Sequence, residues 1–222
     1  MRESEKQESL STVGLDRRNS VKSVDSVKDF APIILTAQPL QEASACIIAQ
    51  ERKRRNDATR KQTADRGSDQ RNAEGDYTGA FGEVLAVQFL EAQGVPAADW
   101  QPLEPKPVPR PDITLLGVPL EIKTSSPGAK SFCINEEQRV KFSAIPDLCY
   151  WPIIREGENR ARLCKPVPAA DVATWQLLTP ADNPKISSPC RSIPFHCLEP
   201  LRSSDQLTAF IPAAQEEKID WK

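Results

Sequence analysis

The chain has 222 residues, of which 39% are apolar and 20 are proline, so it can bury one core with room for loops and tails. No apolar run reaches the ~18 to 20 residues that cross a bilayer, and the polar start MRESEKQESL lacks the apolar segment of a secretory signal. These features predict a soluble, intracellular (cytoplasmic) protein with no membrane partner. The formal net charge of −2 does not by itself indicate a nucleic-acid-binding protein.

The N-terminal part of the chain divides into a tail and a basic helix. Residues 1–30 show no lasting apolar period and residues 32–35 form a short apolar patch, so residues 1–38 are expected to be a disordered or docking tail. A helix with a weak apolar stripe is predicted over about 40–60. Between Glu51 and Arg71, eight basic residues outnumber four acidic ones, a pattern that is usually a solvated helix face.

A clearer helix is predicted from Asp76 or Thr78 to Gly94, after a polar loop over 66–75. Apolar residues at steps of three or four give this helix a core face, and Glu83 lies beside that face. A carboxylate there needs a partner. The ordinary alternative is a first-turn glutamate stabilised by the helix dipole, and Glu83 alone would be interpreted that way.

Five prolines between residues 100 and 111 predict an extended segment that leads into a hairpin. The predicted strands of the hairpin are residues 112–116 and 120–124, joined by a turn at 117–119. Later elements are predicted as strands at 132–134, 148–154 and 160–167, a helix at 136–142 capped by Asn135, and a short helix at 168–178. The remainder, from residue 179, is rich in proline and is expected to be irregular.

The hairpin carries the residues with the clearest chemistry. If it folds about Gly117, Asp112 lies opposite Ile122 and is flanked by Glu121 and Lys123 on a strand ~5 Å away. Residues 121 and 123 then share one face, while Ile122 points to the core. Two carboxylates suit a hard cation such as Mg²⁺, which lowers the pKa of a bound water, and an adjacent lysine stabilises developing charge.

Three alternatives compete with this interpretation. The hairpin could be a surface feature with a weak Asp–Lys pair, although its apolar neighbours favour a half-buried position. An enzyme with a Cys or His nucleophile is disfavoured, because the single His196 lies in a proline-rich segment. A zinc site at Cys190, His196 and Cys197 is also disfavoured, because none of the six cysteines forms a CxxC pair.

Pro111-Asp112, followed after eight residues by Glu121-Ile122-Lys123, resembles the PD-(D/E)xK nuclease superfamily. Gly79-Ala-Phe-Gly-Glu83 resembles the helix that contributes an acidic residue in many members, and Gln138 matches a weaker element of some branches. The resemblance covers about residues 76–167. It implies an α/β, restriction-endonuclease-like core, with a central mixed β-sheet flanked by helices, and a DNA substrate.

On this resemblance, residues 39–178 are expected to be the nuclease domain and residues 179–222 a proline-rich C-terminal extension. The implied Mg²⁺ (or Mn²⁺) ligands are Asp112, Glu121 and Glu83, with Lys123 and Gln138 completing the catalytic set. The expected activity is that of a metal-dependent DNA endonuclease; RNA is the alternative substrate and a homodimer is allowed. The competing hypothesis is an inactive nuclease-fold module that binds DNA or a protein partner.

Beside such a site, the basic run becomes a candidate arm for phosphate contacts, because a polyanion needs a local positive surface on a chain that is negative overall. The residues predicted to bind nucleic acid are Arg52, Lys53, Arg54, Arg55, Arg60 and Lys61.

Overall fold

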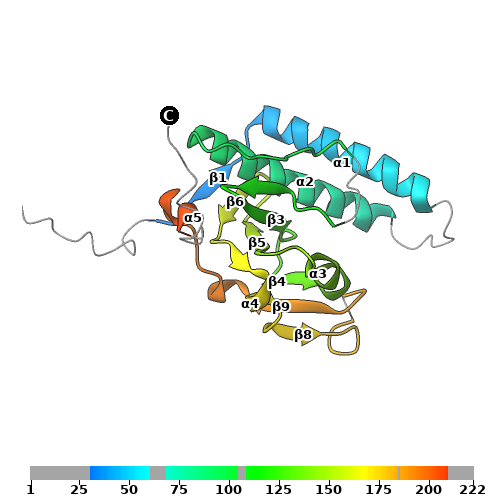
Figure 1. Cartoon of the computed structure of the whole chain (residues 1–222). Coiled ribbons are helices and arrows are strands. Elements are labelled where there is room, and N and C mark those ends of the chain that lie inside the picture. The colour runs from blue at the N-terminus through cyan, green and yellow to red at the C-terminus, as the bar shows by residue number, and fades with distance from the viewer. Residues whose placement is uncertain (1–30, 61–68, 105–108, 185, 210–222) are drawn as a thin grey trace, which may run out of the picture.

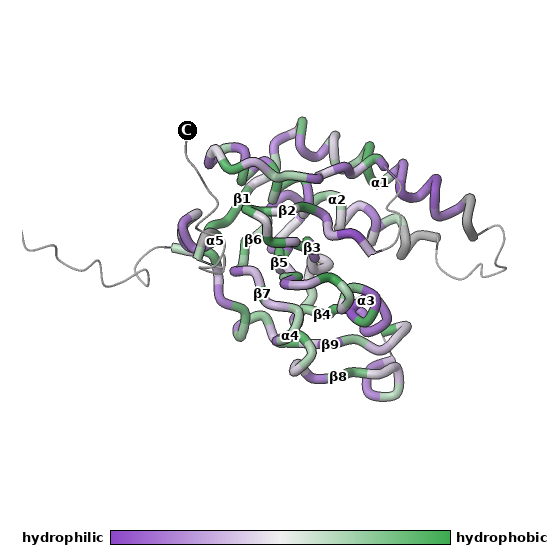
Figure 2. Tube along the Cα trace, viewed as in Figure 1, coloured by the Kyte–Doolittle hydropathy of each residue, from purple (hydrophilic) through white to green (hydrophobic). Residues whose placement is uncertain are grey.

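Two long helices lie along one face of a mixed β-sheet (Figure 1). The computed structural model describes residues 31–60, 69–104, 109–184 and 186–209. Helix α1 spans Pro39–Arg60 and helix α2 spans Asp69–Ala92. Residues 80–87 of α2 are all buried, because this helix packs against both α1 and the sheet. The second half of α1 is hydrophilic in Figure 2, as its basic sequence requires.

The main sheet has the strand order β1-β6-β5-β3-β2, and β7 pairs with β5 off this path. Its strands are β1 (Ile34–Thr36), β2 (Ile113–Leu115), β3 (Val118–Thr124), β5 (Cys149–Arg155), β6 (Arg160–Leu163) and β7 (Val167–Pro168). Strands β3 and β5 are parallel, and the other pairs are antiparallel. The crossover from β3 to β5 contains β4 (Ser131–Asn135) and helix α3 (Glu136–Phe142).

A second sheet, in the order β4-β9-β8, covers part of the opposite face. Its remaining strands are β8 (Gln176–Leu178) and β9 (Cys190–Pro194), and the short helices are α4 (Ala169–Val172), η2 (Phe195–Cys197) and α5 (Asp205–Thr208). Two buried clusters result. One fills the space between the helices and the main sheet, and the other includes Tyr150, Phe132 and Phe142 beneath the second sheet and α3.

The mixed α/β class and the mixed sheet flanked by helices are confirmed. The hairpin strands, β4, β5 and the Asn135-capped helix lie where the sequence predicted them, within one or two residues. No helix among the described ranges is both long enough and apolar enough to cross a membrane.

Several local predictions are wrong. Residues 69–75, expected as loop, belong to α2, so Asp76 and Thr78 lie inside the helix. The predicted helix over 168–178 is only four residues long, and residues 176–178 form β8 instead. Residues 34–36, within the segment expected to be a disordered or docking tail, are ordered and pair with β6 as an edge strand. The segment after residue 179, expected to be irregular, contributes β9 as the middle strand of the second sheet.

Candidate active site

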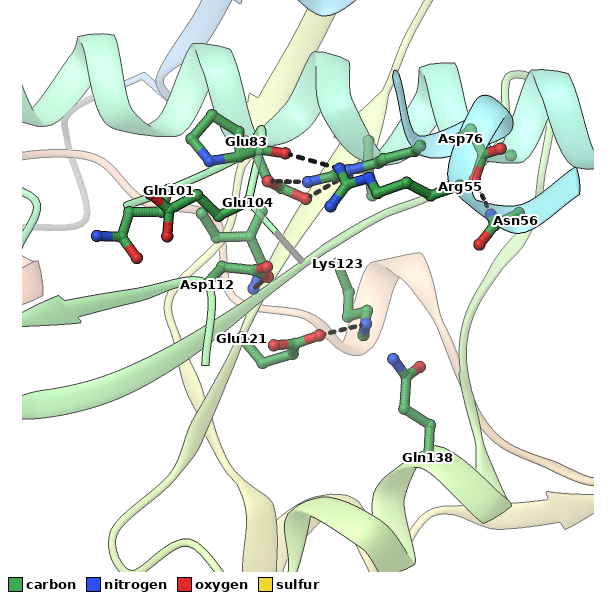
Figure 3. A pocket seen from close by; sticks show the side chains of 16 residues that line it. Arg55, Asn56, Asp76, Glu83, Gln101, Glu104, Asp112, Glu121, Lys123 and Gln138 are labelled. Atoms are coloured by element: carbon green, nitrogen blue, oxygen red, sulfur yellow. Dashed lines mark hydrogen bonds and ion pairs between the residues drawn. The ribbon is translucent and has the colours of Figure 1, made fainter. Parts of the chain in front are cut away.

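An open cavity of about 700 Å³ collects charged side chains where α1, α2, β3 and α3 meet. All five residues predicted for the catalytic set line it: Glu83, Asp112, Glu121, Lys123 and Gln138. Figure 3 shows Glu83 on α2, the Glu121–Lys123 pair on β3, and Gln138 directed from α3 towards that pair. The chain thus brings together at one cavity residues that span positions 83–138 of the sequence.

Asp112 is held at the end of the hairpin by the backbone of the opposite strand. Its amide donates to the Leu120 carbonyl (3.0 Å), and its Oδ2 accepts from the Ile122 amide (2.7 Å). The pairing of Ile113 with Leu120 shifts the register by one residue from the prediction, so Asp112 lies next to Glu121 rather than Ile122. The carboxylate is buried and has a fixed orientation.

The shift in register has its cause in the turn. Leu116 (φ 48°) and Gly117 (φ 86°) both have positive φ, which is the signature of a two-residue type I′ hairpin loop. The predicted turn was centred on Gly117, and the observed one is centred between residues 116 and 117. Leucine gives no sign of this conformation, because positive φ is uncommon for it.

Glu121 and Lys123 point to the same side of β3 and form an ion pair, with Lys123 Nζ 2.6 Å from Glu121 Oε1. Between them Ile122 points to the core under α2, as predicted. Burial lowers the pKa of Lys123, but Glu121 and then Asp112 and Glu83 more than offset it, so the pKa lies above its usual value. Lys123 is therefore a fixed cation in the cavity.

Glu83 is buried and makes a bidentate ion pair with Arg52 of α1. The Arg52 Nη1 and Nη2 atoms lie 2.8 and 2.7 Å from Glu83 Oε1 and Oε2. Because α2 begins at Asp69, Glu83 is in the middle of the helix, and the first-turn interpretation is wrong. The partner of this carboxylate is the Arg52 guanidinium and not the N-terminal end of its own helix.

Gly82 of α2 makes this arrangement sterically possible. A Cβ built on Gly82 would overlap Thr124 Oγ1 of β3 and lie 2.9 Å from Thr124 Cβ. A Cβ on Gly79 would instead make an ordinary contact, 3.6 Å from Arg52 Nη1, so the steric requirement falls on Gly82. Helix α2 therefore lies closer to β3 than any residue with a Cβ allows, and this brings Glu83 to the cavity.

Only part of the basic run predicted to contact phosphates on α1 is exposed on the surface. Arg52 lies in the site and Arg55 lines the cavity, where it donates to the Pro102 carbonyl (3.4 Å). Lys53 is exposed, and Arg54 is exposed and paired with Glu51. The Arg60 side chain and Lys61 lie outside the described residues.

Asp76 lines the cavity without having been predicted there, and Arg52, predicted to bind nucleic acid, is paired with Glu83 inside the site. Asp76, Gly79 and Glu83 follow one another at steps of three and four, so they share one face of α2. This periodicity is visible in the sequence and could have placed Asp76 beside Glu83. No comparable signal links Arg52 to Glu83, since the two residues lie on different helices.

Comparisons with protein-family models, with curated proteins and with solved structures find no match to this chain. Within the described ranges, no three His, Cys, Asp or Glu side chains are grouped as a metal site in the present arrangement. The cavity itself therefore carries the functional argument.

Proposed function

We propose that this protein is a metal-dependent nuclease that hydrolyses DNA phosphodiester bonds in this cavity, on a restriction-endonuclease-like core. The observation that carries the proposal is the meeting of Asp112, Glu121 and Lys123 at one end of β3. Buried carboxylates are costly unless they are compensated, and here Lys123 and the Ile122 amide compensate Glu121 and Asp112. Their position at an open cavity favours use.

The donor set suits Mg²⁺ or Mn²⁺, because these cations prefer carboxylate oxygens to nitrogen or sulfur. Asp112 and Glu121 would hold the ion, with Glu83 as a third ligand. When bound, the ion supplies charge neutralisation at the phosphate and a lowered pKa of water.

The protein's own residues have distinct tasks around a bound phosphodiester. Lys123 donates hydrogen bonds as a cation to the negative charge that develops on the phosphate oxygens. The Ile122 amide fixes the orientation of Asp112, so this carboxylate needs little rearrangement during the reaction. Gln138 offers an amide from α3 that can orient the attacking water or the phosphate.

The test is a cleavage panel with Mg²⁺, Mn²⁺ or EDTA on linear, nicked, branched and single-stranded DNA and on RNA. Asp112→Asn keeps an acceptor for the Ile122 amide but removes the charge, so cleavage should fall by at least about 100-fold. Asp171→Asn, an equal charge change at an exposed position of α4, should cleave like the wild type.

Absence of cation-dependent cleavage on every substrate would contradict the proposal and favour the inactive module that binds DNA or protein. Full activity of Asp112→Asn would place the chemistry elsewhere in the molecule.

A further inference from the structure

Two acidic residues of the cavity, Glu121 and Glu83, already have cationic partners within the chain. Lys123 holds Glu121 Oε1, and Arg52 holds both carboxylate oxygens of Glu83. The Glu83 side chain is 6% exposed and that of Arg52 is 20% exposed, so the pair is largely shielded from water. A bidentate guanidinium–carboxylate pair of this kind is among the more specific contacts in proteins.

Arg52 responds to the whole acidic cluster. Burial lowers its pKa, but the hydrogen bonds and charge of Glu83, followed by the charges of Asp112 and Asp76, raise it further than burial lowers it. The guanidinium is thus a monovalent counter-charge in the place where the proposed function requires a divalent cation.

The packing of α1 on α2 has an independent apolar basis. Ala45, Ile48 and Ala49 of α1 are buried against the core, whereas Arg52 and Glu83 both line the cavity. The ion pair is therefore placed at the site and not within the apolar helix–helix contact.

We propose that Arg52 is a positioning residue that competes with the divalent cation for Glu83 and, once displaced, binds a phosphate of the substrate. This inference rests on the proposed function. A cation bound by Glu83 must approach the same two carboxylate oxygens that Arg52 now contacts, where the two positive charges repel each other. The displaced guanidinium stays beside the cavity, and its planar set of donors matches a phosphate group.

The consequence is coupling between the two ligands. Cation binding should raise the affinity for phosphate, because it releases Arg52 from Glu83. Phosphate binding should raise the affinity for the cation by the same factor, because it removes the competitor for Glu83. Arg52 would then contribute to nucleic-acid affinity only when the cation is present.

The first experiment measures Mn²⁺ binding to the full chain without nucleic acid, by titration calorimetry. Arg52→Gln should bind Mn²⁺ about tenfold more tightly than the wild type, because the competitor is gone. Arg160→Gln removes the same charge from an exposed position on β6 and should bind Mn²⁺ like the wild type. In a Glu83→Gln background, removal of Arg52 should change Mn²⁺ affinity little.

The second experiment measures binding of a short DNA duplex with and without Ca²⁺, another cation that prefers oxygen ligands. With Ca²⁺, the salt dependence of wild-type binding should exceed that of Arg52→Gln by ~0.9 in log–log slope, the share of one phosphate contact. Without the cation, the two slopes should agree. Arg52→Lys keeps the positive charge but cannot contact both carboxylate oxygens as a guanidinium does. Its Mn²⁺ affinity should lie between those of the wild type and Arg52→Gln, and this variant replaces Arg52→Gln in the test if Arg52→Gln does not fold.

The outcomes separate the two proposals. If the wild type does not bind Mn²⁺ or Mg²⁺, the proposed function fails and this inference fails with it. If the wild type binds the cation but folded Arg52→Gln or Arg52→Lys binds it equally or more weakly, Arg52 only supports Glu83, and the nuclease proposal stands alone.

Discussion

At the scale of single residues, Lys123 shows how neighbours fix the state of a side chain. Its raised pKa keeps it protonated at neutral pH, and its ion pair with Glu121 sets its direction. Sequence spacing alone predicted that residues 121 and 123 share a face, because the side-chain period of a strand is two. That Lys123 pairs with Glu121 on this face follows from the folded structure and not from the spacing.

Replacement of Lys123 by methionine should separate chemistry from binding. The cleavage rate should fall by at least about 100-fold, since the cation that stabilises the transition state is lost. Mn²⁺ affinity should be kept or increased, because Glu121 loses its competitor. Lys165→Met, which breaks an ion pair with Glu199 outside the cavity, is the control for charge. Calorimetry and single-turnover cleavage measure the two effects; equal loss of both would make Lys123 a structural residue.

Glu136 gives a prediction about pH that does not depend on function. Hydrogen bonds from Arg139, and then from Arg191 of β9, lower its pKa to about 2. A carboxyl with a depressed pKa stabilises the fold above its unfolded pKa near 4.5, and this contribution is lost as the pH falls towards 2.

The free energy of unfolding should therefore decrease between about pH 4.5 and 2, with roughly 2 to 3 kcal/mol arising from Glu136 after allowance for its partial exposure. Glu136→Gln should flatten this dependence in urea unfolding series. Glu137→Gln should flatten it far less, because the pair of Glu137 with Lys141 is exposed and screened by water. If the free energy of unfolding falls equally with pH in Glu136→Gln and the wild type, Glu136 is not the source of the acid dependence.

At the scale of elements, local signals predicted α3 well and the start of α2 badly. The Asn135 side chain accepts from the Gln138 amide (3.1 Å), which is the capping contact that its sequence position predicts. Asp76 has the same capping chemistry but bonds to Asn56 of α1 (3.4 Å), within a helix that begins seven residues earlier. A cap signal competes with tertiary contacts, and here the contact with α1 decides the outcome.

The close approach of α2 to β3 predicts an outcome for Gly82→Ala. The new methyl group cannot fit beside Thr124, so the helix must move and carry Glu83 away from Asp112. We expect a loss of stability of about 1 to 3 kcal/mol, as for other overpacked sites, together with loss of cleavage.

Gly75→Ala is the matched control for Gly82→Ala, because nothing lies within 4 Å of its added Cβ in the same helix. This variant should gain roughly 0.5 to 1 kcal/mol from helix propensity. Thermal unfolding measures the change in stability of each variant, and the cleavage assay measures the change in activity. Unchanged stability of Gly82→Ala would show that the helix has more room than the structure indicates.

At the scale of the whole molecule, the sequence could predict short-range features and missed the long-range ones. The hairpin, its polar face and Glu83 follow from spacing within about forty residues. The insertion of β9 between β4 and β8 joins β9 to a strand more than fifty residues earlier in the chain. The contact of Arg52 with Glu83 spans 31 residues but joins two separate helices, so no periodicity within one element predicts it. Frequent prolines also hid β9, because such a segment offers little periodicity.

The C-terminal segment is part of the main core. The Ile33 amide donates to Leu201 (2.8 Å), the Leu201 amide to Leu163 (2.9 Å), and the Leu163 amide to Ile33 (3.1 Å), so three distant segments meet. Leu201 and Leu207 are buried in the cluster beneath α1 and α2. The predicted domain end at residue 178 would remove both leucines and β9.

Leu201→Ala and Leu207→Ala should each lower the free energy of unfolding by about 2 to 5 kcal/mol, because each leaves a cavity in the core. Leu177→Ala, at a leucine that is 43% exposed, should cost far less. A chain ended at residue 178 should lose cooperative unfolding altogether, since the contacts of Leu201 with β6 and of β9 with β4 disappear. Urea titrations followed by circular dichroism measure all four proteins. Cooperative unfolding of the shortened chain at wild-type stability would support residue 178 as the domain boundary, with the C-terminal segment as an accessory layer.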